Sequence, residues 1–79
     1  MPFTKELTDE LDLILRFPHK SLMQGLKIHN DADPALVAAA QRLFEKGIVD
    51  QHDGGYLTNL GHDLAEHAIV ITSALTTKL

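Results

Sequence analysis

Residues 33–64 contain a nearly complete set of start and stop signals for a helix, a β-hairpin and a second helix. Asp33 suits a helix N-cap, and Pro34 suits the first helical position, where its missing N–H removes no hydrogen bond. The alanine-rich segment 35–46 has high helix propensity, and Gly47 can end it. We therefore expect a helix over 35–46 at the centre of the fold.

Two short apolar runs, 48–50 and 56–58, follow this helix and are separated by Gln-His-Asp-Gly-Gly at 51–55. Asp-Gly-Gly is a turn signal because glycine tolerates a positive φ, so we expect a compact hairpin. Thr58 can then cap a last helix. Its core-facing stripe has spacings of three and four and consists of Leu60, Leu64, Ala68, Ile71 and Leu75.

The first helix is expected to begin after Thr4 and to end near Phe17, because Pro18 disfavours helical geometry in the residue before it. Its core stripe is predicted to be Leu7, Leu11, Ile14 and Leu15, with acidic residues on the opposite face. A second, shorter helix is expected from about Ser21, with Leu22, Met23 and Leu26 pointing inward. Residues 27–29 either extend that helix or form a short extended segment.

The length of 79 residues has room for one domain, 1–79, and a domain this small buries only about 60% of its unfolded surface. The chain has no cysteine, which excludes disulfides and thiolate zinc sites, so oligomerisation is the expected way to gain stability. Ile69, Val70 and Ile71 are consecutive and point around the last helix. We expect a homodimer through residues 60–79; the alternative is that both sides of this helix pack within one monomer.

The sequence gives little support for a membrane protein, an enzyme or a metalloprotein. No apolar stretch approaches 20 residues and the N-terminus lacks the layout of a signal peptide, so we expect a cytoplasmic protein without a membrane partner. Ser21 and Ser73 have no glycine-rich elbow and no phosphate-binding loop is present, so we expect neither an enzyme nor a cofactor. His62 and His67 lie on different helix faces, so no metal site is expected.

The net charge of −4 is unfavourable for binding phosphates, although residues 16–29 carry Arg16, Lys20 and Lys27 without an acid. This segment is either a weak basic patch or ordinary solvated surface.

Two short patterns resemble the back half of winged-helix domains. Leu43, Gly47 and Ile48 match the end of a recognition helix, and Leu57, Thr58 and Gly61 match the segment after the wing. The whole chain is also similar to a family of small, uncharacterised proteobacterial proteins that are sometimes labelled DNA-binding. The resemblance implies a mainly α fold with a short β-hairpin, winged helix-turn-helix-like, and a DNA-binding or transcription-associated role.

In that role, the helix at 35–46 would have to read double-stranded DNA, because the predicted wing tip has no lysine or arginine. Arg42 could pair with guanine and Gln41 with adenine, while Lys20, Lys27 and Lys46 would contact phosphates. Arg42 and Lys46 could equally be a solvated helix face. The outward residues of this helix are predicted to be Ala35, Ala38, Ala39, Gln41, Arg42, Glu45 and Lys46. The alternative function is a protein-interaction or dimerisation module without nucleic acid.

Overall fold

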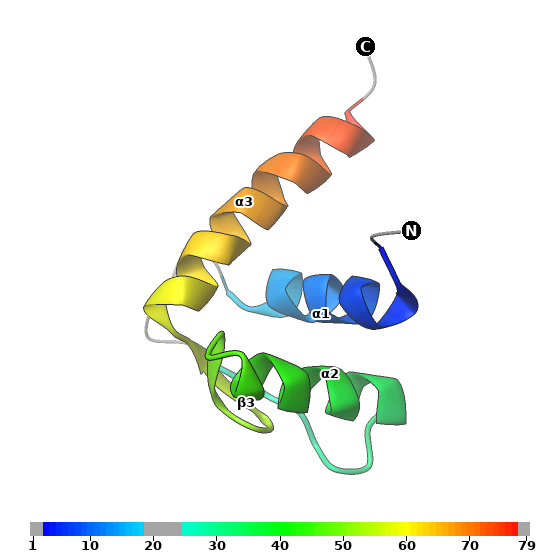
Figure 1. Ribbon diagram of the computed structural model, residues 1–79, viewed down its shortest axis with the longest axis vertical. Helices are drawn as coiled ribbons and strands as arrows, with labels where there is room; N and C mark the ends of the chain where they lie inside the picture. The colour runs from blue at the N-terminus through cyan, green and yellow to red at the C-terminus, as the bar shows by residue number, and fades with distance from the viewer. Residues whose placement is uncertain (1–2, 19–24, 78–79) are drawn as a thin grey trace.

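The computed structural model describes residues 3–18 and 25–77, which form three helices and a small antiparallel sheet (Figure 1). In chain order the elements are α1 (Lys5–Arg16), β1 (Leu26–Lys27), α2 (Pro34–Glu45), β2 (Val49–Gln51), β3 (Gly54–Leu57) and α3 (Asn59–Thr76). The expected mainly α fold with a β-hairpin is confirmed at this level.

The sheet has the strand order β1-β3-β2, and both pairings are antiparallel. Leu26 lies opposite Gly55 at one edge, and Val49 lies opposite Leu57 at the other. The chain therefore forms one edge of the sheet, passes through α2, and returns to form the other edge before the central strand.

The core side of α1 differs from the prediction. Thr4 caps the helix as expected, with the Leu7 N–H donating to its Oγ1 at 3.2 Å. The buried positions, however, are Glu10, Leu13 and Ile14 together with Phe17 just after the helix, whereas Leu7 and Leu11 are each 38% exposed. The predicted stripe was wrong at Leu7 and Leu11 because α2 packs against the side of α1 that carries Glu10.

The segment between α1 and α2 also differs. Leu26 was predicted to point inward from a short helix, but it belongs to β1. Of the two alternatives for residues 27–29, the short extended segment is correct at Lys27, which is also part of β1. The Ile28 N–H continues this contact by donating to the Asp53 carbonyl at 2.7 Å. The predicted helix start at Ser21, with Leu22 and Met23, lies outside the described residues.

The signals around α2 are confirmed: the Ala35 N–H donates to the Asp33 side chain at 2.9 Å, and Gly47 has a φ of 75°. The hairpin turn is shorter than predicted, because Gly54 and Gly55 belong to β3 and only residues 52–53 form the turn. A Cβ on Gly54 would lie 2.3 Å from the Leu26 carbonyl oxygen. This close approach of β1 explains why glycine is a strand residue here.

The first part of α3 packs on the core and the second part does not. Thr58 caps the helix by accepting from the Gly61 N–H at 3.1 Å, and Gly61, Ala65 and Ala68 are buried. The predicted core stripe is wrong at Leu60, Ile71 and Leu75, which are exposed. In Figure 1, α3 lies near the C-terminal end of α1 and then diverges from it, so that residues 69–76 extend beyond the other elements.

Eleven buried apolar residues from all three helices and the sheet form the core: Leu13, Ile14, Phe17, Ile28, Ala39, Ala40, Leu43, Ile48, Val49, Leu57 and Ala65.

Candidate interaction surfaces

The cations of α2 are held in a charged cluster against α1. Glu10 is only 5% exposed, and it accepts a hydrogen bond from Arg42 Nε at 3.1 Å and another from Lys46 Nζ. Arg42 Nη2 also donates to the Glu6 carbonyl oxygen at 3.2 Å. Burial alone would raise the pKa of Glu10, but the hydrogen bonds from Lys46 and Arg42 outweigh burial and lower that pKa. We name Glu10, Arg42 and Lys46 the Glu10 cluster.

The other predicted DNA contacts lie elsewhere. Lys27 forms an ion pair with Asp53, and its hydrogen bond lowers the pKa of that carboxyl group. Gln41 Nε2 donates to Glu45 Oε2 at 3.1 Å. Lys20 lies outside the described residues.

The predicted DNA-contacting set is therefore divided between two places: Arg42 and Lys46 meet at Glu10, whereas Lys27 and Gln41 line a pocket described below. Ala39, which was predicted to face outward on α2, is fully buried, and that prediction was wrong. The helix is rotated so that its alanine face at 39–40 joins the core, because small side chains allow α1 and the sheet to pack closely on it.

Few positive charges are available for an anionic partner in residues 3–18 and 25–77. Four of the five lysines and arginines in these ranges form ion pairs with carboxylates of the same chain: Lys5, Lys27, Arg42 and Lys46. The net charge of −4 adds to this effect. A DNA partner would have to compete with these internal pairs.

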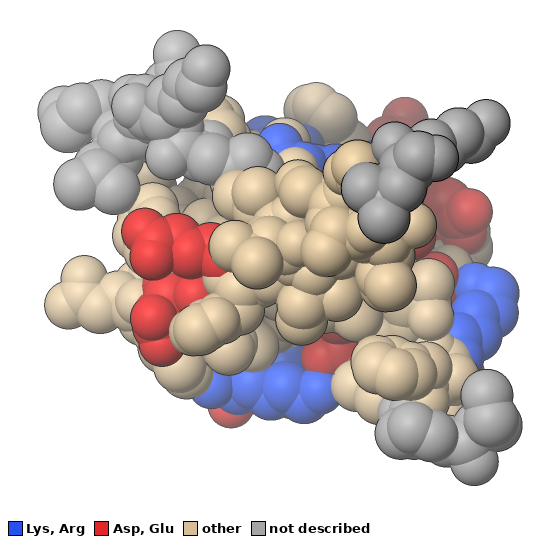
Figure 2. All heavy atoms as spheres, turned by 90° about the horizontal axis from the view of Figure 1, so that it is seen from above, with Lys and Arg blue, Asp and Glu red and all other residues tan. Residues whose placement is uncertain are grey.

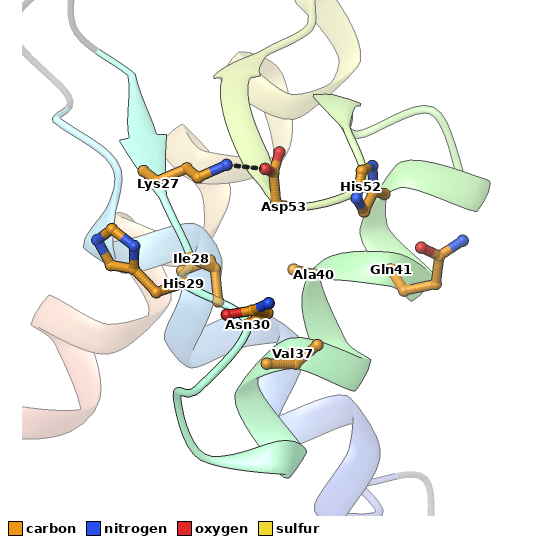
Figure 3. A pocket seen from close by; sticks show the side chains of 9 residues that line it. All are labelled: Lys27, Ile28, His29, Asn30, Val37, Ala40, Gln41, His52 and Asp53. Carbon is orange, nitrogen blue, oxygen red and sulfur yellow. Dashed lines mark hydrogen bonds and ion pairs between the residues drawn. The ribbon is translucent and has the colours of Figure 1, made fainter.

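A pocket of about 380 Å³ lies between α2, the segment 27–30 and the hairpin turn (Figure 3). Its floor is apolar and its rim is polar. The lining residues are Lys27, Ile28, His29, Asn30, Val37, Ala40, Gln41, His52 and Asp53.

The second surface is apolar and belongs to α1 and α3. Val70, Ile71 and Leu75 are 67%, 59% and 81% exposed, and residues 68–77 contain no charged side chain. Figure 2 views the molecule from the side to which α3 extends: uncharged residues fill the middle of this face, and charged ones lie around it. Phe3, just before α1, and Leu7 and Leu11 on α1 are exposed as well. We name the exposed apolar residues of the two helices together the α1–α3 apolar surface: Phe3, Leu7, Leu11, Val70, Ile71 and Leu75.

Comparison with known proteins identifies the chain by family. A family model described as a family of unknown function (DUF5669) matches residues 1–76. The chain belongs to the DUF5669 family. No curated protein matches it, and no solved structure does.

The family match confirms the predicted membership of an uncharacterised family, while the DNA-binding label and the proteobacterial source stay predictions. The matched range ends at Thr76, the last residue of α3, so the exposed end of this helix lies inside the DUF5669 domain.

Two further results concern metals and membranes. Nowhere in residues 3–18 and 25–77 do three side chains of His, Asp or Glu lie close enough together to hold a metal ion. On α3, His67 Nε2 lies 3.8 Å from an Asp63 oxygen, which brings two such side chains together and not three. None of the described helices has both the length and the apolar content to cross a membrane.

Sequence reasoning missed the pocket and the Glu10 cluster. One usable signal for the cluster was the position of Glu10, three residues before Leu13 and four before Ile14, which is the spacing of one helix face. The pocket depends on the pairing of β1 with β3, which brings residues 27–30 beside residues 52–53. No local pattern encodes that pairing.

Proposed function

We propose that this DUF5669 protein is a self-associating interaction domain, in which the α1–α3 apolar surface binds the same surface of a second copy. The observation that carries this proposal is the exposure of Val70, Ile71 and Leu75 on a charge-free helix end. A helix that is apolar around most of its circumference is normally buried.

The area of the surface fits a dimer. Its six residues together expose on the order of 600 Å², which is at the upper end of the largest apolar patches of typical monomers and below the ~800 Å² that each partner contributes to a standard interface. The neighbouring Thr72, Ser73, Ala74 and Thr76 are also exposed and would add to the contact.

The shape of the surface favours a second copy as the partner. One apolar stripe runs along α1 from buried Ile14 to exposed Leu7, and the other runs along α3 from buried Ala68 to exposed Leu75. The two helices diverge toward these exposed ends (Figure 1). The free end of α3 in one copy can therefore lie against α1 of the other, and the reciprocal contact closes a two-fold dimer.

The strand order β1-β3-β2, with α2 before the hairpin and α3 after it, supports a winged-helix-like topology for the interaction domain. Within this topology DNA binding by α2, through Gln41, Arg42, Lys46, Lys27 and Lys20, is the competing function. We rank it second because Arg42 and Lys46 are already paired with Glu10.

The test is the molar mass in solution, measured by size-exclusion chromatography with light scattering. We expect twice the chain mass of 8.7 kDa for the wild type at about 100 μM and the monomer mass for Ile71→Glu with Leu75→Glu, because carboxylates in an apolar interface are strongly unfavourable. Gln51→Glu also adds a carboxylate at an exposed position, on the hairpin, and should stay dimeric.

A wild type that is monomeric at this concentration would overturn the proposal. The same samples are titrated with duplex DNA at two salt concentrations. The competing function would be established instead if the wild type is monomeric and binds the duplex. The logarithm of its affinity should then fall with the logarithm of the salt concentration, with a slope of about 0.9 per phosphate contacted.

A further inference from the structure

The pocket beside α2 combines a flat apolar floor with polar groups on two sides. Ile28 and Ala40 are buried and Val37 is half-buried, so the base of the pocket is apolar and Val37 is its accessible part, against which a planar ring can pack. Asn30 stands on one side and Gln41 and His52 on the other, with Asp53 above (Figure 3). Such an arrangement is typical of sites for small organic ligands.

The rim presents hydrogen-bond acceptors. Lys27 contacts Asp53 Oδ2, and a carboxylate has further lone pairs for a ligand N–H. The Gln41 amide nitrogen donates to Glu45 Oε2 at 3.1 Å, which orients the amide and leaves its Oε1 to accept. A ligand that carries N–H donors therefore finds acceptors on this rim.

The charge of the rim disfavours an anion. Lys27 and Asp53 neutralise one another. No other lysine, arginine, aspartate or glutamate lines the pocket. The His52 ring can instead stack on a planar ligand.

From this chemistry we infer that the pocket binds a nucleobase with an exocyclic amine, as in adenine or cytosine. Glutamine pairs with the amine edge of adenine, and an aspartate accepts from the amine of cytosine. The volume of about 380 Å³ lies within the range of known ligand sites. No lining residue belongs to α1 or α3, so the site is separate from the α1–α3 apolar surface and independent of dimer formation.

The test is a titration of the full chain with nucleosides, followed by backbone amide NMR shifts. Adenosine and cytidine should shift the signals of residues 27–30, 37–41 and 52–53 with a dissociation constant below about 1 mM. Inosine and uridine, which carry a carbonyl in place of the amine, should bind at least about tenfold more weakly. Absence of shifts at about 10 mM adenosine, or equal binding of inosine and uridine, would overturn the inference.

Variants locate the site. Gln41→Ala and His52→Ala should each weaken adenosine binding by about tenfold while the remaining amide spectrum stays that of the folded protein. Gln51→Ala removes an exposed glutamine that does not line the pocket, and it should leave affinity unchanged. Equal losses in Gln41→Ala and Gln51→Ala would contradict the assignment.

The amine-bearing base could come from a free nucleoside or from a single-stranded nucleic acid. A four-nucleotide oligodeoxyadenylate that binds at least about tenfold more tightly than adenosine identifies the single strand as the source, and equal affinity identifies the nucleoside.

Discussion

Two regions of the molecule place polar and apolar side chains in opposite ways. One is the contact between α1 and α2, and the other is the C-terminal end of α3. At the first, the carboxylate of Glu10 is buried between two helices and receives hydrogen bonds from Arg42 and Lys46. At the second, Val70, Ile71 and Leu75 are exposed to solvent. A buried charge that forms ion pairs needs no group from outside the chain, whereas an exposed apolar surface is removed from water only when another molecule covers it. This difference is the reason we propose α3, and not the cations of α2, as the interaction surface.

The largest effect on stability is expected for Glu10→Ala. The change removes the shared acceptor of Arg42 and Lys46 and leaves space between α1 and α2. Removing one partner of a fully buried ion pair costs about 3–5 kcal/mol, and we expect about 2 kcal/mol here because both cations are partly exposed and can regain water.

Urea unfolding of the monomeric Ile71→Glu, Leu75→Glu background measures this effect without a contribution from association. Glu66→Ala, on the exposed side of α3, is the matched control and should change the unfolding free energy by less than about 0.5 kcal/mol. Equal effects of the two substitutions would show that the Glu10 cluster contributes no special stability.

The pH dependence of unfolding isolates the charge of Glu10. Its folded pKa is lowered, so its contribution is complete above the unfolded value of about 4.3 and is lost as the pH falls through the folded pKa. Glu10→Gln lacks this contribution at every pH. The difference in urea midpoint between the two proteins should therefore narrow to a small remainder as the pH falls below the unfolded value and through the lowered folded pKa, and a constant difference would contradict the prediction.

Much of the fold was predictable from local signals. Asp33, Pro34 and Gly47 set the bounds of α2, and Thr4 and Thr58 cap the other two helices. Each signal acts within one turn of backbone, which is why the sequence alone reveals it.

The choice of the buried helix face was less predictable. Both sides of α1 carry leucines, and the packing of α2 decides which side is buried. The pocket was out of reach for the same reason, because it requires β1 to pair with β3. The exposure of Ile71 and Leu75, which were predicted to face the core, depends on where the core ends. The expectation of a second apolar face at residues 69–71 came from the sequence, and its role as a dimer contact stays a prediction.

If the exposed apolar end of α3 is a dimer contact, the thermal stability of the protein depends on its concentration. A dimer is favoured by mass action, so each tenfold increase in concentration should raise the Tm of the wild type by a few degrees, about 3 °C for a chain of this size. The Ile71→Glu, Leu75→Glu variant should have a Tm independent of concentration. Differential scanning calorimetry over a hundredfold range, about 10 μM to 1 mM, distinguishes the two proteins, and a constant Tm for the wild type would speak against association.

The smallest effect is expected for Lys27→Met, which removes the ion pair between β1 and the hairpin turn. The Lys27 side chain is mostly exposed, unlike Glu10, and exposed pairs contribute little to stability because water and salt screen them. Urea unfolding at low and high salt should therefore show nearly equal stability for wild type and variant at high salt. If Lys27→Met were as destabilising as Glu10→Ala, burial could not be what distinguishes the two ion pairs, and the packing of β1 against the hairpin turn would depend on charge as strongly as the packing of α1 against α2 does.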